Sequence, residues 1–143
     1  MSFDPVEALS YGMSAARMRV NVLASNIANA EVTRTPEGGP YKRRDVVQIA
    51  RDVPTSFGNA LDKATLAVPQ VGAIVEDQSP ARKVFQPGHP DADKDGYVAF
   101  PNINVVTTMT DLMSATRLYQ ANVTAMETAR RMSSDAQRIS QSV

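Results

Sequence analysis

The 143-residue sequence contains no cysteine, no tryptophan and a single histidine, and these absences exclude much chemistry. Without cysteine the chain can form neither a disulfide nor a thiolate metal site, and His89 has no second imidazole with which to share a zinc ion. Basic and acidic residues number 15 each, so no excess charge favours nucleic acid or an anionic membrane. We expect no membrane span, because no apolar run reaches about 18 residues. We also expect no cleavable secretory signal, because no basic-then-apolar leader precedes the first helix.

Motifs that would indicate an enzyme are also missing. The sequence has no P-loop, no dinucleotide-binding fingerprint, no nucleophile elbow and no paired-carboxylate motif. We therefore predict no catalytic activity, no cofactor and no bound metal.

Two clusters leave open an alternative reading as a small calcium- or nucleic-acid-binding module. Asp91, Asp93, Asp95 and Gly96 match the start of an EF-hand loop, but the position of its bidentate glutamate is Asn102. The preceding Gln86 to Pro90 cannot form the helix that such a loop requires, so a solvated turn is favoured. Lys42, Arg43 and Arg44 form one basic cluster that could contact phosphate, although a lone cluster in a neutral chain more often forms a polar interface.

The longest regular stretch runs from roughly Asn104 to Ile139 and contains neither glycine nor proline. Its apolar residues fall on three adjacent heptad rows, a face wider than the two-row seam of a coiled-coil dimer. Such a helix needs more than one neighbour. The residues predicted to meet other subunits on it are Leu112, Ala115, Leu118, Tyr119, Val123, Met126 and Met132.

A second helix is predicted near the start of the chain, where Asp4 can cap it and Pro5 suits its first position. Its apolar residues step by three and four, forming a narrow two-row seam. They are Val6, Leu9, Met13, Ala16, Val20, Leu23, Ile27 and Ala30, and all are predicted assembly contacts. The two terminal helices should pack as a coiled-coil-like pair.

Between the helices, prolines and glycines interrupt short β-branched runs, which predicts a small antiparallel sheet. The candidate strands are Asp45 to Ile49, Ala64 to Val68, Val71 to Glu76, Arg82 to Phe85 and Tyr97 to Phe100. Arg51 to Lys63 is predicted to be a mobile loop. The expected fold is α+β, with an N-terminal axial helix in 1–33, a small β-rich domain in 34–103 and a C-terminal axial helix in 104–143.

Two distant sets of residues form motifs that resemble those of a known protein family. The first set is Ser25, Asn26, Ile27, Ala28 and Asn29, then Thr35 and Pro36, then Tyr41. The second set comprises Pro87 to Pro90, Asp95 to Val98, Pro101 to Val106 and Ser114 to Val123. The first set resembles the signature of the bacterial flagellar rod and hook family, and the second is similar to a proximal-rod subunit of that family. The elements of the first set are spaced more widely here than in relatives with a compact turn.

The resemblance implies a non-catalytic subunit of the flagellar basal-body rod, the drive shaft that crosses the periplasm and encloses the export channel. It implies export through the flagellar type III apparatus without cleavage. The implied partners are other rod proteins, further copies of this chain, that export apparatus and the rod-cap muramidase. Terminal helices with excess apolar surface also fit subunits that join through heterologous contacts into open helical arrays.

Overall fold

Two long helices frame the chain, as the sequence predicts. The computed structural model describes residues 5–52 and 67–141. Helix α1 covers Pro5–Ala28 and α2 covers Val105–Gln141. Proline stands at the first position of α1, where its missing N–H is not needed; the predicted cap Asp4 lies outside the described residues. Helix α2 starts at a cap that Asn104 provides, because its Oδ1 accepts the Thr107 N–H at 3.1 Å.

The β structure consists of two antiparallel two-stranded sheets, and the α+β fold class is confirmed. Strand β1, Arg44–Asp52, pairs with β2, Ala67–Glu76, and we call this pair the β1–β2 ribbon. Strand β3, Arg82–Phe85, pairs with β4, Tyr97–Phe100. The expectation of one sheet is therefore wrong.

Strand β2 also corrects the predicted strand boundaries. The sequence predicts separate strands on either side of Pro69, whereas Val68 and Val71 belong to one continuous strand. A two-stranded ribbon has two free edges, so a proline can occur inside a strand without breaking a central ladder. The described part of the predicted loop, Arg51 and Asp52, is the end of β1; residues 53–63 of that loop, and 64–66 of the predicted strand, lie outside the described residues.

A bulge in the ribbon explains one of its glycines. The register shifts between Val47 and Gln48, which leaves Gly72 without a partner residue on β1. A Cβ atom at residue 72 would lie 3.1 Å from Cγ2 of Ile49, closer than nearly all such contacts. Glycine therefore leaves room for the Ile49 side chain at the bulge.

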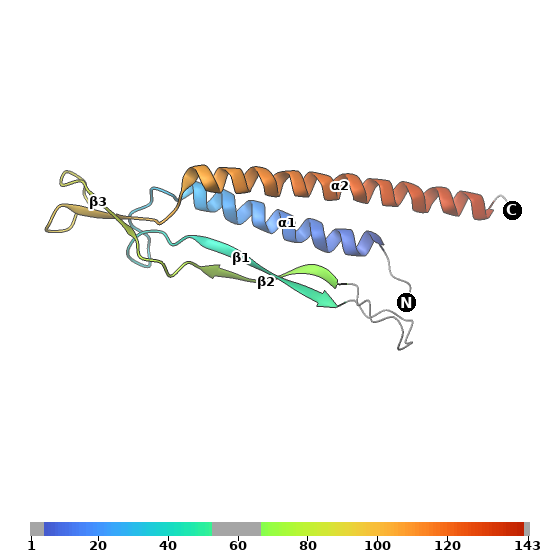
Figure 1. The fold of residues 1–143 in the computed structure, drawn as a ribbon, viewed down its shortest axis with the longest axis horizontal. Coiled ribbons are helices and arrows are strands. Elements are labelled where there is room, and N and C mark those ends of the chain that lie inside the picture. Colours follow the sequence, from blue (N-terminus) through green and yellow to red (C-terminus); the bar gives the residue numbers. More distant parts are fainter. Residues whose placement is uncertain (1–4, 53–66, 142–143) are drawn as a thin grey trace.

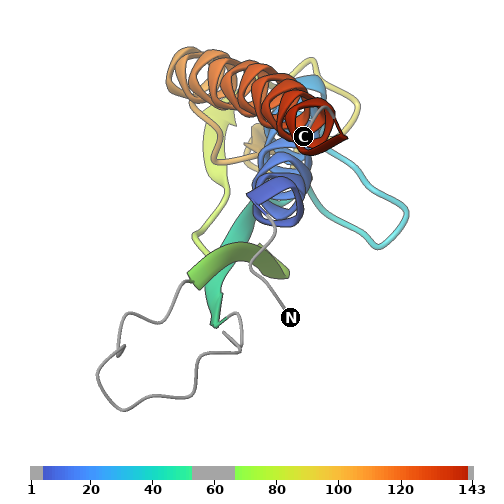
Figure 2. The same cartoon turned by 90° about the vertical axis from the view of Figure 1, so that its right-hand side faces the viewer.

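Helix α1 occupies the middle of an elongated molecule. It packs against α2 on one side and against the β1–β2 ribbon on the other (Figures 1 and 2). Ala16 and Leu23 of α1 are buried, as are Val68 of the ribbon and Met126 of α2. On the ribbon side, the Arg51 guanidinium lies 5.9 Å from the ring centre of Tyr11.

Helix α2 is longer than α1, and its C-terminal end extends past the start of α1 (Figure 1). Every side chain that the structure describes between Arg130 and Ile139 is exposed. We call residues 130–141 the α2 overhang. The β3–β4 hairpin lies at the opposite end of the molecule (Figure 1). No described helix combines the length and the apolarity needed to cross a membrane.

Candidate assembly site

The junction between α1 and the ribbon is built by the asparagines of the first motif. Asn26 is fully buried, and its amide satisfies both backbone groups of Arg44: its Nδ2 donates to the carbonyl at 2.7 Å, and its Oδ1 accepts the N–H at 2.9 Å. The Tyr41 hydroxyl donates to the same Oδ1 at 3.2 Å. Asn29 donates from Nδ2 to the carbonyl of Ser25 at 2.8 Å, one turn back along the helix. These motif residues fix where the ribbon leaves the helix.

The wide spacing of the first motif is closed by the loop itself. The Tyr41 N–H donates to the Val32 carbonyl at 3.0 Å, and the Thr35 N–H donates to the Gly39 carbonyl at 2.8 Å. Gly38 and Gly39 both have positive φ, which glycine adopts without steric cost. Tyr41 thereby returns to the end of α1 despite the residues inserted between them. Thr35 and Pro36 lie in this loop rather than in the junction, and Ala28 is exposed.

Most of the predicted assembly residues are at least partly covered within the chain itself. Five of them are buried within the chain: Ala16, Leu23, Ala30, Ala115 and Met126. A further eight are half-buried: Val6, Leu9, Met13, Val20, Ile27, Leu112, Tyr119 and Val123. Ala30 follows the end of α1, in a turn where its N–H donates to the Ile27 carbonyl at 3.2 Å. The chain therefore covers many of these residues itself, and their contact with other subunits stays a prediction.

One heptad row of α2 is largely exposed to solvent. Leu118 and Met132, both predicted assembly residues, are 52% and 68% exposed, and Ile139 of the same row is 66% exposed. Ala125 lies between them and is exposed too. Because these residues are spaced by seven along one helix, they form a continuous stripe beside the seam. We call Leu118, Ala125, Met132 and Ile139 the outer row.

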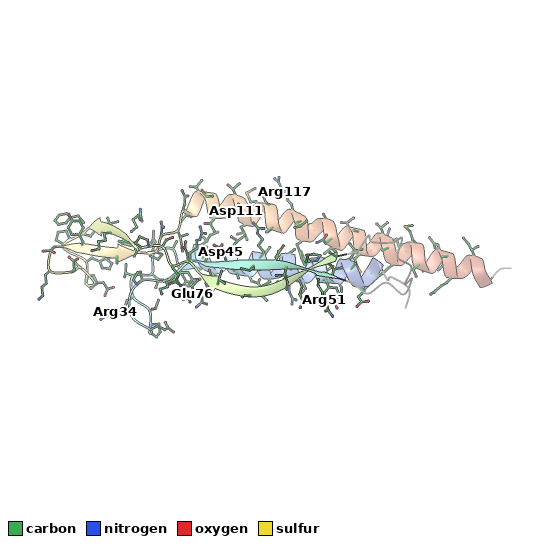
Figure 3. All side chains as sticks on the ribbon, turned by 60° about the horizontal axis from the view of Figure 1, so that its bottom comes forward. Arg34, Asp45, Arg51, Glu76, Asp111 and Arg117 are labelled. Carbon is green, nitrogen blue, oxygen red and sulfur yellow. The ribbon has the colours of Figure 1, made fainter. Side chains whose placement is uncertain are left out.

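A groove between the helices carries positive charge. It has a volume of about 320 Å³, and its apolar lining includes Met13, Tyr119 and Met126. Arg17 of α1 and Arg130 of α2 stand at its walls. A second groove of about 200 Å³ is lined by Arg19, Val22, Leu23, Asp45, Val46 and Asp111. Figure 3 shows Asp45 and Asp111 close together, with Arg117 directed away from α1.

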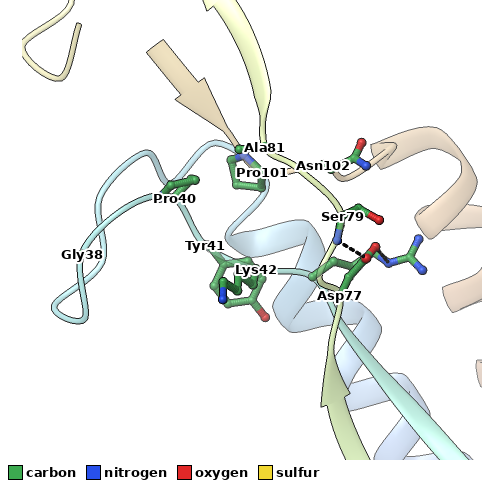
Figure 4. Close-up of a pocket in the computed structure, with 10 residues that line it drawn as sticks. Gly38, Pro40, Tyr41, Lys42, Asp77, Ser79, Ala81, Pro101 and Asn102 are labelled. Carbon is green, nitrogen blue, oxygen red and sulfur yellow. Dashed lines mark hydrogen bonds and ion pairs between the residues drawn. The ribbon is translucent and has the colours of Figure 1, made fainter. Parts of the chain in front are cut away.

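A third cleft lies where the loop that follows α1, which contains Gly38 and Pro40, meets the segments on either side of the β3–β4 hairpin (Figure 4). It has a volume of about 200 Å³, and its lining includes Pro40, Tyr41, Lys42 and Pro101. At its edge, the Ser79 N–H donates to Oδ1 of Asp77 at 2.8 Å, and Nε of Arg43 lies 3.6 Å from Oδ2. Hydrogen bonding by Ser79, aided by the Arg43 charge, lowers the pKa of Asp77 below its ordinary value.

The basic cluster is largely occupied by ion pairs inside the chain. Arg43 pairs with Asp45 at 2.6 Å, and Arg44 pairs with Glu76 at 3.2 Å while lying 5.7 Å from the Tyr41 ring centre. These contacts favour a polar packing role over phosphate binding.

In the acidic loop that suggested calcium binding, Asp91 and Asp93 also form hydrogen bonds within the chain. Oδ1 of Asp93 accepts the N–H groups of Asp95 and Tyr97 at 2.9 and 2.8 Å. Asp91 accepts the Thr33 hydroxyl at 2.8 Å and lies 3.6 Å from Arg34. Across residues 5–52 and 67–141, no group of three or more His, Asp or Glu side chains is placed to hold a metal ion.

Several of these contacts give no signal in the sequence. Thr108 and Asn122 are polar, yet Thr108 is buried and the Asn122 side chain packs against Gly12 of α1. The Thr33 to Asp91 hydrogen bond joins residues 58 positions apart. The first motif marked Asn26, Asn29 and Tyr41 in advance, whereas Arg44 was marked only as part of the basic cluster and not as the partner of Asn26.

Comparison with known proteins matches both ends of the chain. A family profile described as "Flagella basal body rod protein" matches residues 7–34, and one described as "Flagellar basal body rod FlgEFG protein C-terminal" matches residues 94–139. The flagellar basal-body rod protein FlgC of Borreliella burgdorferi is 35% identical, with 91% of each chain covered. The FlgC proteins of Salmonella typhimurium and Bacillus subtilis are 40% and 34% identical; the first match covers 84% of each chain, and the second covers 92% of this chain and 93% of its relative.

Terminal helices that match rod profiles at both ends, joined by a thin β region, define a structural component of the bacterial flagellar rod. Within that class, the extent and identity of the matches are specific. The chain belongs to the flagellar basal-body rod protein C family, FlgC.

Proposed function

We propose that this chain is a non-catalytic rod subunit that joins copies of itself and other rod proteins through its terminal helices. In this role it forms part of the drive shaft in the periplasm and of the wall of the export channel. Export by the flagellar type III apparatus, and contacts with that apparatus and with the rod-cap muramidase, belong to the same proposal. They rest on the family relationship rather than on any contact described above.

The observation that supports assembly best is the outer row of α2. Leu118 and Met132 are more than half exposed although they continue the apolar pattern of the seam. Soluble monomers rarely leave an extended apolar stripe in water, and such stripes mark surfaces that meet another protein. Contacts between unlike surfaces of neighbouring subunits build open helical arrays, which is the geometry a rod requires.

The three-part division of the chain also remains a proposal. Helix α1 packs against both α2 and the ribbon, so residues 1–33 and 104–143 would act as one axial unit. Residues 34–103 would then act partly as a brace along that unit and partly as a separate hairpin at its end.

Complementation of a flagellated strain that lacks its own FlgC tests the assembly role. Leu118→Asp places a charge in the outer row, so we expect normal protein levels but loss of rod assembly and motility. The matched control is Thr124→Asp, because Thr124 is exposed on the same helix but lies outside the outer row. Cells that carry this control variant should be motile. Motile cells carrying Leu118→Asp would contradict the role of the outer row, and a rod assembled without the chain would contradict the proposed function.

A further inference from the structure

The groove between α1 and α2 that carries Arg17 and Arg130 lies on a different flank of the helix pair from the outer row. We call it the arginine groove. Its α2 residues, Tyr119, Met126 and Arg130, are spaced by seven and four along the helix. With 3.6 residues per turn, they lie on one side of the buried Ala115, and the outer row lies on the other. The helix pair therefore has two separate surfaces, of which the outer row is only one.

The arginine groove offers both apolar surface and hydrogen-bond donors. Met13 and Tyr119 line it and are only half-buried. Arg17 and Arg130 are exposed, and within the described residues neither takes part in an ion pair. The Tyr119 hydroxyl likewise forms no hydrogen bond to any residue that the structure describes. Two guanidinium groups and a phenol are therefore available to a partner beside an apolar floor.

These groups select an acidic partner. A guanidinium carries a permanent positive charge and several N–H donors, so a carboxylate is the group that satisfies it best. The Tyr119 hydroxyl can donate to a carboxylate as well. The apolar floor requires apolar side chains next to that carboxylate, and a groove that runs between two helices suits a third, amphipathic helix.

A second copy of this chain matches the groove poorly. Helices α1 and α2 together carry six arginines and only four acids. Two of the acids, Glu127 and Asp135, each have two arginines within one turn of the same helix. Asp111 shares the second groove with Arg19, and Glu7 lies in the first turn of α1, where the helix dipole favours it. A copy would therefore bring its own positive charge toward the arginines, whereas an acid-rich helix of another protein would not.

We propose that the arginine groove receives an amphipathic helix of another rod protein. Carboxylates of that helix pair with Arg17 and Arg130, and its apolar side chains pack against Met13, Tyr119 and Met126. The proposal rests on the proposed rod function and names the chemistry of one neighbour. The outer row and the arginine groove then contact different subunits, so this chain lies between two neighbours in the rod.

Charge reversal in the groove tests the contact. The variant carries Arg17→Glu and Arg130→Glu in the full-length protein, expressed in a flagellated strain that lacks its own FlgC. We expect loss of rod assembly and motility, while the unfolding midpoint of the dilute purified protein stays unchanged because both side chains are exposed. The matched control is Arg117→Glu, because Arg117 is an exposed arginine of α2 that points away from α1 (Figure 3). Cells that carry the control should be motile.

Photocrosslinking identifies the neighbour. The probe p-benzoylphenylalanine replaces Ser14, which is exposed and lines the arginine groove. Irradiation of basal bodies from motile cells should link the probe to a helix of another rod protein, at a residue within one turn of an acid. The same probe at Thr124, which is exposed on α2 outside the groove, should not give that crosslinked peptide.

Exchange of charges then tests the pairing itself. Arg17→Glu and Arg130→Glu are introduced singly, and the acid of the crosslinked helix is changed to arginine. Assembly should be restored in the single variant that faces this acid, because the pair is re-formed with its charges exchanged.

The outcomes separate this contact from the rod function. Motile cells that carry both charge reversals, or that give no crosslink from Ser14, would overturn the groove contact while the rod function stands. Loss of motility in the Arg117→Glu control as well would show that the effect does not belong to the groove. A crosslink from Ser14 to a second copy would overturn the choice of another protein, and a crosslinked helix without an acid would overturn the carboxylate match. If the Ser14 probe itself prevents assembly, the charge reversals and their control decide the contact.

Discussion

Single residues at the end of α1 decide how the ribbon is attached to the helix. The sequence marked Asn26 through its motif and Arg44 through its charge, but nothing predicted their contact, because it uses the backbone of Arg44 and not its side chain. An asparagine amide can satisfy one donor and one acceptor together, which few other side chains can do. The motif could therefore predict that Asn26 is important, but not that its amide binds the backbone of Arg44.

Asn26→Ala should destabilise the chain, because it leaves the N–H and carbonyl of Arg44 without their partners. We expect a loss of about 1–3 kcal/mol in the free energy of unfolding, measured by urea denaturation. Tyr41→Phe removes one hydrogen bond to the same amide and should cost only about 0.5–1.5 kcal/mol. Equal effects of the two variants would contradict the bidentate role of Asn26.

Asp93 should be a structural turn residue whose charge is dispensable. Asp93→Asn keeps the Oδ1 atom that accepts two N–H groups, so unfolding should change by less than about 0.5 kcal/mol. Asp93→Ala removes that acceptor and should cost about 1–3 kcal/mol. Calcium titration of the unchanged protein is the companion measurement. A calcium-dependent rise in stability that Asp93→Asn abolishes would revive the calcium-binding alternative.

Asp77 should make the stability of the folded chain depend slightly on pH in acidic solution. Because its folded pKa is lowered from the ordinary 3.8, its stabilising contribution is present above pH 3.8 and is lost as pH falls through the lowered value. An NMR titration of the carboxyl group should therefore place its midpoint below 3.8. Ser79→Ala should raise that midpoint toward the ordinary value, whereas an unchanged midpoint would show that the Ser79 side chain has no part in the shift.

At the scale of elements, hydrophobic periodicity predicted both helices because each presents one apolar side over many turns. Periodicity could not predict which of the adjacent apolar rows of α2 packs against α1. The row of Leu112, Tyr119 and Met126 turns inward, while the row of Leu118 and Met132 remains exposed. Which row meets α1 depends on small or polar residues at the contact, such as Ala115 and Asn122. Likewise, Pro69 was taken to end a strand because sequence alone cannot show that the strand has a free edge.

A pair of methionines on α2 can test this assignment of rows. Met126 is 8% exposed and packs at the seam, so Met126→Ala should lower the free energy of unfolding by about 2–5 kcal/mol. Met132 is 68% exposed, so Met132→Ala should change it by less than about 0.5 kcal/mol. Thermal or urea unfolding of dilute protein provides both values. Similar losses for the two variants would mean that the overhang packs within the monomer.

At the scale of the whole molecule, the chain exposes more surface than a compact protein of its mass. Its accessible surface is 10562 Å² at 15.5 kDa, whereas a compact monomer of that mass exposes roughly 7,200 Å². The described core is correspondingly thin, and alanines supply four of its nine buried apolar residues. Helices α1 and α2 are also joined through the whole β region, so their pairing closes a long loop before any burial is gained. We therefore expect such a monomer to gain much of its stability when neighbouring subunits cover it.

Thermal stability should therefore depend on protein concentration. Association that favours the folded state raises the unfolding midpoint by mass action, and a subunit with an exposed outer row has that association available to it. We expect the midpoint of the purified full-length protein to rise across a hundredfold concentration range, as followed by circular dichroism at 222 nm, a standard wavelength for helix, with light scattering alongside. Leu118→Asp should unfold at the low-concentration midpoint of the parent at every concentration, because Leu118 is 52% exposed and contributes little to the monomer. Thr124→Asp should follow the parent. A midpoint that is high and independent of concentration would show that the chain folds fully without neighbours, and the outer row would then need another explanation.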